Sequence, residues 1–411
     1  MADLQVELNA TAEAGVLDQP STEPFTEPSA EPFTEPSAEL FTEPAQPAIS
    51  EPEAEPEAEP ASELEAEPAS EPEAEPASDP DPLPDPLLRA HALLAAHPVA
   101  DGYSGLPWAL RELPWCDLEL GESGVEADVP RLRAGGVGAQ FWSAHVPENL
   151  SSDRALGVTL EQLDFIKHVV DDHPEGLRLA RTASEAVDAR YCGRIATLIG
   201  PARAAAIGDS LATLRALHDL GLCSLTLSGT SWAGPDGLSP FGDEVVRELN
   251  RLGVLPELSG ASEATVRRVL TLSRAPALFV RSGALALREA PGNLSDGLLT
   301  ALGKAKALCL VPLAAEQTGS SIREVADHLD HVRRLAGPEC VGLSGMYDTL
   351  AAHPDGLADV SGYPYLVAEL IERGWPDAEL AMLTWGNVQR ALRSADFTAR
   401  AARERRRQTS G

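Results

Sequence analysis

The chain has 411 residues and a formal net charge of −32, which is enough for one large domain and an appendage. The charge is uneven, because residues 1–88 hold 24 of the 64 acidic residues and no Lys or Arg, so the remainder has 40 acidic and 32 basic residues. A mildly acidic body excludes the basic surface that nucleic-acid binding requires, and no apolar run in the chain approaches the roughly 18 residues of a transmembrane segment.

Residues 1–86 form the first predicted region. The unit EPFTEPSA recurs from residue 23 to about residue 44, and the related unit EPEAEPAS recurs from residue 51 to about residue 79. Frequent proline excludes a helix, and the like charges repel one another. The repeats therefore predict a disordered, acidic Pro/Glu-rich arm, which serves as a charged spacer or, alternatively, as a docking arm for a partner.

A region of alternating strands and helices is predicted over residues 87–395, beginning with a short amphipathic helix at 87–96. The predicted strands are 195–200, 224–228, 253–258, 276–280, 307–312 and 340–343, and helical patterns occupy 210–220, 241–251, 263–273 and 321–336. Such alternation is typical of a parallel sheet covered on both faces. It favours an α/β fold of the TIM-type (β/α)8 barrel kind. A doubly wound open sheet is the alternative, and residues 396–411 are predicted to be a basic C-terminal tail.

Functional side chains of a (β/α) barrel follow the C-terminal ends of its strands, and a zinc site needs three or four His, Cys, Asp or Glu side chains at one point. The residues after the predicted strands include one carboxylate, Asp348, and no His or Cys. All nine histidines fall in helical or loop-like stretches; they are His91, His97, His145, His168, His173, His218, His328, His331 and His353. The i, i+3 pair His328 and His331 is interpreted as part of a solvated helix face rather than a metal site.

The cysteines and the termini bear on location. The five cysteines, Cys116, Cys192, Cys223, Cys309 and Cys340, show no C-x-x-C spacing. Cys223 and Cys309 lie in apolar, strand-like runs and are expected to be reduced, buried thiols. Neither a signal peptide nor a hydrophobic GPI-type tail is apparent. We therefore expect an intracellular protein, and the alternative is an extracellular, membrane-anchored one whose true termini differ.

Several motifs resemble those of the membrane dipeptidases. They are GGVGAQFWS at 135–143, GLSPFG at 237–242, ELNRLG at 248–253, SRAP at 273–276, and the residues GL, DVS and YP at 356–357, 359–361 and 363–364. The chain is similar to this family over about residues 87–395, and it somewhat resembles the dipeptidase 3 branch. The resemblance implies a barrel of the metallo-dependent hydrolase kind, a homodimer and, in active members, hydrolysis of dipeptides with two zinc ions.

The same resemblance implies where the zinc ligands would stand, and each position is substituted. The family's DGHNDLP, whose His and second Asp bind zinc, reads DGYSGLP at 101–107, so these positions are Tyr103 and Gly105. The bridging Glu position is Ala202, and two further His positions are Gly260 and Arg281.

Other functional positions of the family also differ. The His that contacts substrate is replaced by Gly229, the acid/base Asp by Met346, and the Arg that holds the substrate carboxylate aligns near Pro291. Two family cysteine positions fall at about Glu148 and Ser231, whose loss agrees with a reducing compartment.

These substitutions predict loss of metal chemistry. Hydrolysis in the family depends on a metal-activated water, and Gly, Ala and Met are poor ligands for zinc. We therefore expect no zinc, no other cofactor and no catalytic residue, in a pseudoenzyme that binds a small ligand, a peptide or a protein partner. The alternatives are an active zinc dipeptidase with other ligands, and an interaction protein that acts through its acidic arm.

A pocket is predicted at the barrel mouth from Asp101, Glu257, Arg281, Tyr347 and Asp348. Arg281 brings a positive charge to a metal-ligand position of the family. We expect it to pair with Asp101 or Glu257, because an unpaired buried carboxylate is costly. The alternative is that Arg281 points into solvent.

Overall fold

The computed structural model describes residues 85–113, 116–121, 124–147 and 150–409, all within the unit Asp79–Gly411. Residues 1–84 of the predicted arm, which was expected to extend to residue 86, and the family cysteine position at Glu148 lie outside the described residues. The first described element is α1 (Pro86–Ala96), which confirms the helix predicted at 87–96. Its start is set by Asp85, whose carboxylate accepts a hydrogen bond from the backbone N–H of Leu87, and by proline in the first turn.

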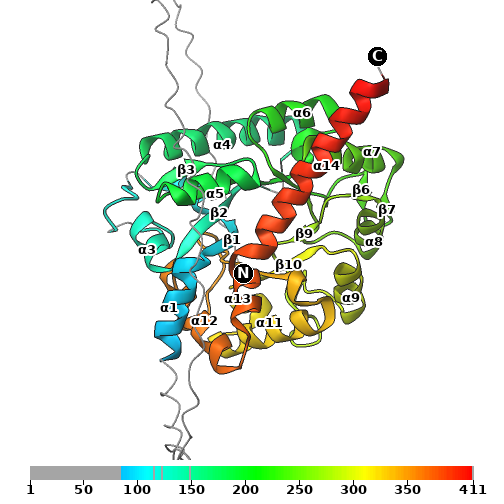
Figure 1. The fold of residues 1–411 in the computed structure, drawn as a ribbon. Helices are drawn as coiled ribbons and strands as arrows, with labels where there is room; N and C mark the ends of the chain where they lie inside the picture. The colour runs from blue at the N-terminus through cyan, green and yellow to red at the C-terminus, as the bar shows by residue number, and fades with distance from the viewer. Residues whose placement is uncertain (1–84, 114–115, 122–123, 148–149, 410–411) are drawn as a thin grey trace, which may run out of the picture. The chain divides into compact units, whose positions relative to one another are not determined.

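Eight parallel strands close into a barrel with helices around it (Figure 1). In the order in which they pair, they are β1 (Val99–Ser104), β2 (Val137–Ala144), β4 (Ile195–Arg203), β5 (Ser224–Thr226), β8 (Leu255–Glu257), β9 (Leu278–Phe279), β10 (Leu308–Pro312) and β11 (Val341–Ser344). Pairing of β11 with β1 closes the ring, while β3 (Leu177–Leu179) pairs with the start of β4. The predicted (β/α)8 barrel is confirmed, and the open-sheet alternative is wrong.

The apolar pattern located six of these eight strands, with ends that differ by a few residues. The strand β2 was not predicted because Gly138, Gln140 and Ser143 interrupt its apolar run, although the whole strand is buried. Its polar side chains are tolerated there because Gln140 and Ser143 both make hydrogen bonds inside the barrel wall.

Most of the helices follow the strands in βα order. Their bounds are α2 (Leu106–Glu112), α3 (Val129–Ala134), α4 (Ser152–Asp172), α5 (Ala183–Tyr191), α6 (Leu211–Asp219), α7 (Pro240–Leu252), α8 (Glu263–Leu272), α9 (Asp296–Lys304), α10 (Ala315–Thr318), α11 (Ile322–Ala336), α12 (Tyr363–Glu372), α13 (Asp377–Ala381) and α14 (Asn387–Thr409). A short hairpin of β6 (Ala233–Gly234) and β7 (Gly237–Leu238) precedes α7. Several helices begin after a Ser or Thr whose hydroxyl accepts a backbone N–H, as Ser239 does for α7 and Ser321 for α11.

The core has two parts. A large apolar layer lies between the strands and the surrounding helices, and a second cluster fills the barrel interior with residues such as Phe141, Leu198 and Leu310. The interior cluster continues into Trp385 and Leu392, so α14 packs against one end of the barrel. Asn387 places this helix at the start of β11, where its amide donates to the carbonyls of Pro338 and Val341.

The C-terminal residues continue this helix. Figure 1 shows α14 crossing the strands, and the helix runs without interruption from Asn387 to Thr409. Residues 396–409, predicted as a basic tail, therefore form its last turns, and Ala399 is still buried.

The interpretation of His328 and His331 as part of a solvated helix face is wrong. They lie on α11 with relative exposures of 2% and 8%. Helical periodicity places His328 beside the buried Val325 and Val332, on the stripe that faces the barrel. The ring nitrogen Nδ1 of His328 accepts a hydrogen bond from Ala284 N at 2.9 Å, and burial lowers the pKa of His328 to about 4.

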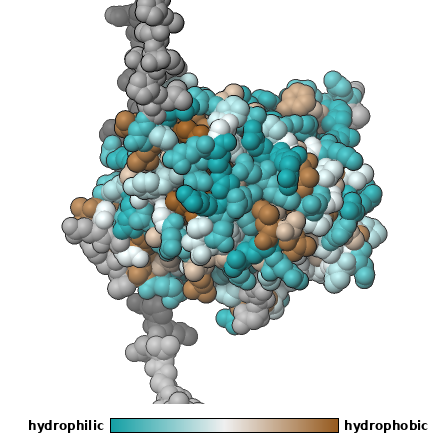
Figure 2. Space-filling model, turned by 90° about the horizontal axis from the view of Figure 1, so that it is seen from below, coloured by the Kyte–Doolittle hydropathy of each residue, from teal (hydrophilic) through white to brown (hydrophobic). Residues whose placement is uncertain are grey.

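The surface and the cysteines show two further features. Among the residues that the structure describes, no helix combines the length and apolar character needed to cross a bilayer. On the face shown in Figure 2, hydrophobic residues are scattered among hydrophilic ones. All five cysteines are free, and Cys223 and Cys309 are buried, as expected for those two.

Replacing Leu310 should test the packing of the barrel interior. Its side chain fills the space left by two glycines, since a Cβ at Gly342 would approach it to 2.6 Å and one at Gly102 to 3.2 Å. We expect Leu310→Ala to lower the free energy of unfolding by about 2–5 kcal/mol, because a cavity remains. Leu88→Ala, at a position that is 65% exposed, should change it by less than about 0.5 kcal/mol. Equal effects of the two variants in urea unfolding would contradict this packing.

Candidate functional site

Two adjoining cavities lie at the C-terminal ends of the strands. The larger has a volume of about 680 Å³ and is lined from β1, the loop after β11 and α2. The smaller has a volume of about 70 Å³ and lies at the ends of β2, β4 and β5. Tyr103, His145 and Arg281 line both cavities, so these three side chains form the boundary between them.

The predicted site residues divide into cavity-lining and buried groups. Tyr103, Gly105, Arg281, Met346 and Asp348 line the larger cavity. Below the mouth, Asp101, Glu257 and Tyr347 are fully buried. Elsewhere, Ala202 is buried within β4, and Gly229 and Gly260 are exposed turn residues with positive φ angles of 72° and 75°.

Several residues at the mouth were missed by the sequence prediction. His145 lies in a loop, as predicted, but this loop directly follows β2, a strand that was not predicted, so the histidine stands at a strand end and lines both cavities. Its ring packs edge-on against Trp108, with centroids 4.9 Å apart. Arg203 at the end of β4 and Glu126 were also missed. His145 directly follows the FWSA run at 141–144 in the sequence. Recognising that run as the end of a strand would have identified His145 as a residue of the barrel mouth.

Glu257 is a buried carboxylate surrounded by donors. It accepts hydrogen bonds from Ser259 N at 2.7 Å, Thr226 Oγ1 at 2.6 Å and Val280 N at 3.4 Å. The Nη2 atom of Arg281 lies 4.0 Å from its Oε2 atom. The pairing expected for Arg281 is therefore present with Glu257, at the outer limit of an ion pair.

Arg281 also packs against Tyr103. Its guanidinium carbon lies 5.7 Å from the centre of the tyrosine ring, within the range of a cation–π contact. The side chain of Arg281 remains 38% exposed, whereas its Nε atom is buried and has no hydrogen-bond partner among the described residues.

Asp101 is the second buried carboxylate. Its oxygens accept hydrogen bonds from Gly345 N at 2.6 Å, Gln140 Nε2 at 2.8 Å and Tyr103 N at 3.2 Å. Trp142 Nε1 donates to Gln140 Oε1 at 2.8 Å, which fixes the direction of the Gln140 amide. This explains the Gln and Trp of the GGVGAQFWS motif. Burial raises the pKa of Asp101 to about 6, although these hydrogen bonds oppose the rise.

A third polar cluster lies beside the larger cavity. Asp348 Oδ1 accepts a hydrogen bond from Glu126 N at 2.7 Å, and Asp348 N donates to Glu126 Oε2 at 2.6 Å. Burial raises the pKa of Asp348 to about 7. The ring of His353 lies between two acceptors, Leu313 O at 2.6 Å and Glu126 Oε2 at 3.2 Å. Burial opposes its charged form, but these acceptors prevail and raise the pKa of His353.

The loop after β11 leaves no room for a side chain at position 105. A Cβ atom built on Gly105 would overlap the carbonyl oxygen of Asp348. This loop is held by hydrogen bonds from Gly105 N to Tyr347 O at 2.8 Å and from Met346 N to Tyr103 O at 3.0 Å. Met346 and Asp348 adopt left-handed φ angles of 59° and 58°, which are costly for residues other than glycine.

The mouth offers little to a metal ion. In the described part of the chain, no group of three or more His, Cys, Asp and Glu side chains is arranged to hold one. The buried carboxylates below the mouth, Asp101 and Glu257, already accept three hydrogen bonds each from protein donors. Of those that line the larger cavity, Asp348 and Glu126 each accept a hydrogen bond from the other's backbone N–H. The residues present at the barrel mouth therefore do not fit a two-zinc centre.

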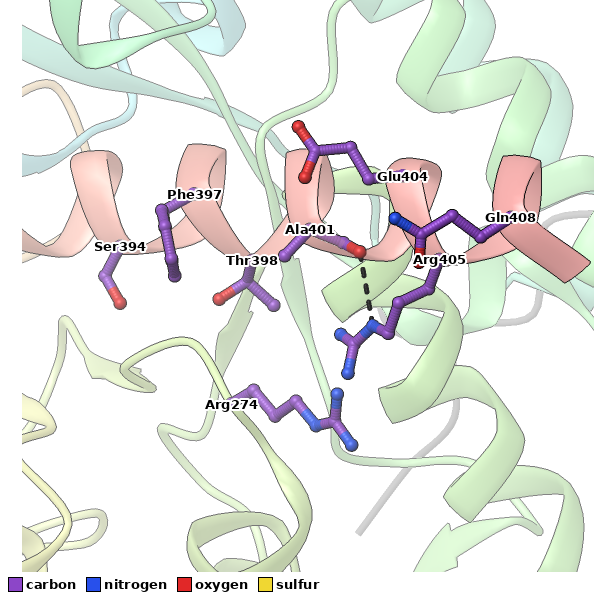
Figure 3. A pocket seen from close by; sticks show the side chains of 8 residues that line it. All are labelled: Arg274, Ser394, Phe397, Thr398, Ala401, Glu404, Arg405 and Gln408. Atoms are coloured by element: carbon purple, nitrogen blue, oxygen red, sulfur yellow. Dashed lines mark hydrogen bonds between the residues drawn. The ribbon is translucent and has the colours of Figure 1, made fainter.

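A separate hollow lies along α14. Its volume is about 640 Å³, and Figure 3 shows the guanidinium groups of Arg274 and Arg405 pointing into it. Arg405 donates to the carbonyl of Ala401 one turn earlier in the helix. Arg274 precedes β9 in the chain, so the hollow lies near the end of the barrel where strands begin. Its position is unlike that of the functional sites of this fold.

Comparisons with known proteins agree with this geometry. A model of the membrane dipeptidase family (peptidase family M19) matches residues 87–406. Dipeptidase 3 of Mus musculus is 36% identical over 337 residues, covering 76% of this chain and 68% of its own. The structure of dipeptidase AC, a metallo peptidase, is 25% identical with a TM-score of 0.64, covering 72% of this chain and 98% of its own. A metallo peptidase from Rhodobacter sphaeroides, 24% identical over 72% of this chain and 99% of its own, has the same fold with a TM-score of 0.65.

The raised pKa of Asp101 should make stability depend on pH. The carboxyl of Asp101 has a pKa of about 6 in the folded state, against an ordinary value of 3.8 that applies to the unfolded chain. Its contribution to the free energy of unfolding is therefore fully present below pH 4 and is lost as the pH rises through 6. Each tenfold difference in proton affinity between the two states corresponds to about 1.4 kcal/mol. We expect the free energy of unfolding of the protein, minus that of Asp101→Asn, to fall between pH 4 and 6. Because Asp348 is present in both proteins, its own titration cancels when the two free energies of unfolding are subtracted. A difference that does not vary with pH would contradict the raised pKa of Asp101.

Removing Arg281 should destabilise the fold modestly. Arg281→Ala leaves buried Glu257 with its hydrogen bonds but without the opposite charge, so we expect a loss of about 1–2 kcal/mol in unfolding free energy. Arg247→Ala is the matched control, because the Arg247–Glu244 pair is exposed and such pairs contribute less than about 1 kcal/mol. Unchanged thermal stability in Arg281→Ala would mean that the contact with Glu257 has no energetic weight.

Proposed function

The chain belongs to the membrane dipeptidase family, and from that premise we propose that it is a non-catalytic member which binds a ligand at the barrel mouth. One observation carries the proposal. Arg281 and Tyr103, which stand at two of the five metal-ligand positions of the family, pack on each other at the boundary of the two cavities.

Electrostatics supports the loss of metal. Two unit charges about 4 Å apart interact with roughly 4 kcal/mol at an effective dielectric constant of 20, and a divalent ion experiences about twice that. A guanidinium among the ligand positions would therefore repel zinc, where the family places a neutral imidazole. The overlap of a side chain at Gly105 with Asp348 O further means that a carboxylate there would require the loop after β11 to move.

The cavities support a binding role. The larger, at about 680 Å³, is within the range typical of small-molecule sites, and it combines the apolar Trp108 and Leu350 with several ionisable side chains. The homodimer, a peptide or protein partner, and a role for the acidic arm stay predictions. The five free cysteines support a reducing compartment for this chain.

Zinc content and turnover test the proposal together. We expect the purified full chain, incubated with zinc chloride and dialysed, to retain far less than one zinc per chain by mass spectrometry. It should hydrolyse no member of a dipeptide panel above the buffer rate, because no metal-activated water is available.

The variant His145→Ala supplies the control. His145 is the imidazole that lines both cavities, so zinc that is lost in this variant was bound at the mouth. Two zinc ions per chain, together with dipeptide hydrolysis that disappears in His145→Ala, would establish an active enzyme and reject the proposal.

A further inference from the structure

The smaller cavity has the chemistry of an anion site. Its volume of about 70 Å³ compares with about 30 Å³ for one water molecule in the liquid, so it has the size of a single carboxylate or phosphate group. Among the described residues that line it, the charged side chains are Arg203 and Arg281, accompanied by the imidazole of His145 and the hydroxyls of Ser143 and Ser228.

Both arginines line this space. Arg203 donates from Nη1 to the carbonyl of Val146 at 3.3 Å, which anchors one edge of its guanidinium beside the cavity. A Cβ at Gly229 would lie 3.7 Å from Arg203 Nη2, so this guanidinium extends toward the exposed turn after β5. Arg281 has a buried Nε without a hydrogen-bond partner among the described residues. Guanidinium groups bind carboxylate and phosphate oxygens through paired, charge-assisted hydrogen bonds.

Glu257 does not fill this role for Arg281. It is fully buried beneath the mouth and does not line the smaller cavity. Three shorter hydrogen bonds already satisfy its oxygens, and Arg281 approaches only to 4.0 Å. The guanidinium therefore retains donors for a ligand.

The larger cavity has the opposite charge. Its walls carry the carboxylates of Glu112, Glu126, Glu316 and Asp348, with Arg281 on the boundary with the smaller cavity. A ligand that spans both cavities would meet positive charge at one end and negative charge along the rest.

We propose that the smaller cavity binds the single anionic group of a small organic ligand, a carboxylate or a phosphate, whose uncharged or positively charged body extends into the larger cavity. This inference rests on the proposed ligand-binding role and names the chemical class of the ligand. It places an anion beside positions at which active relatives are expected to hold metal cations.

Titration of the full chain with simple anions tests the inference. Acetate and inorganic phosphate, titrated calorimetrically in EDTA against chloride at equal ionic strength, should show saturable binding in the millimolar range. Comparison of the acetate titration with the phosphate titration distinguishes a carboxylate ligand from a phosphate ligand. Arg281→Gln and Arg203→Gln should each weaken binding by about tenfold or more, whereas Arg247→Gln, at an exposed surface pair, should not change it.

A matched pair of ligands tests the orientation. We expect 4-aminobutyrate to bind more tightly than succinate, because the second carboxylate of succinate would face Glu126 and Asp348. No binding of either simple anion, or equal binding by all three arginine variants, would overturn the inference. Tighter binding of succinate would also overturn it.

These outcomes are separable from those of the zinc assay. A zinc-free, inactive chain that binds no anion would reject the anion site and leave the loss of catalysis in place. A zinc-loaded, active chain would reject the proposed function whatever the titrations show. Circular dichroism of each variant checks folding, and two independent arginine positions keep the test decisive if one variant is unstable.

Discussion

The barrel mouth depends on the burial of two carboxylates, Asp101 within β1 and Glu257 at the end of β8. A buried charge is tolerated only when donors surround it. The donors come from different strands: Gln140 of β2 and the loop after β11 serve Asp101, while Thr226 of β5 and the residue after β9 serve Glu257. Each carboxylate therefore ties neighbouring strands together where the site is built.

This donor requirement shapes the loop after β11. Gly345 must direct its N–H at Asp101, and a Cβ on Gly345 would itself approach Asp101 Oδ2 to 2.6 Å. The loop then turns through two left-handed residues and lays the carbonyl of Asp348 on Gly105. The glycine at position 105 and the path of this loop therefore depend on each other. A side chain at position 105 would require the loop to take another path, and the present path requires a glycine there.

The sequence predicted the barrel well, because uniformly apolar strands such as β10 leave few other arrangements. The substituted metal-ligand positions rest on the resemblance alone, through motifs whose order along the chain is specific, and stay a prediction. The sequence could not reveal that His145 follows a strand, because β2 is polar in part. It also could not reveal that His328 is buried, because an imidazole is tolerated on either face of a helix. The convergence of Arg203 with Arg281 joins residues 78 positions apart, which only the closure of the barrel brings together.

The five substitutions are consistent with one another in charge. Relative to the ligand set that the resemblance implies, Gly105 and Ala202 remove two carboxylates, and Arg281 adds a guanidinium. The net charge at these five positions therefore rises by three, close to the four positive charges that two zinc ions would bring. Without such a change, the buried Asp101 and Glu257 would lie in a field of uncompensated negative charge. On the ligand positions that the resemblance implies, the proposed replacement of metal ligands and the burial of these two carboxylates are therefore compatible in charge.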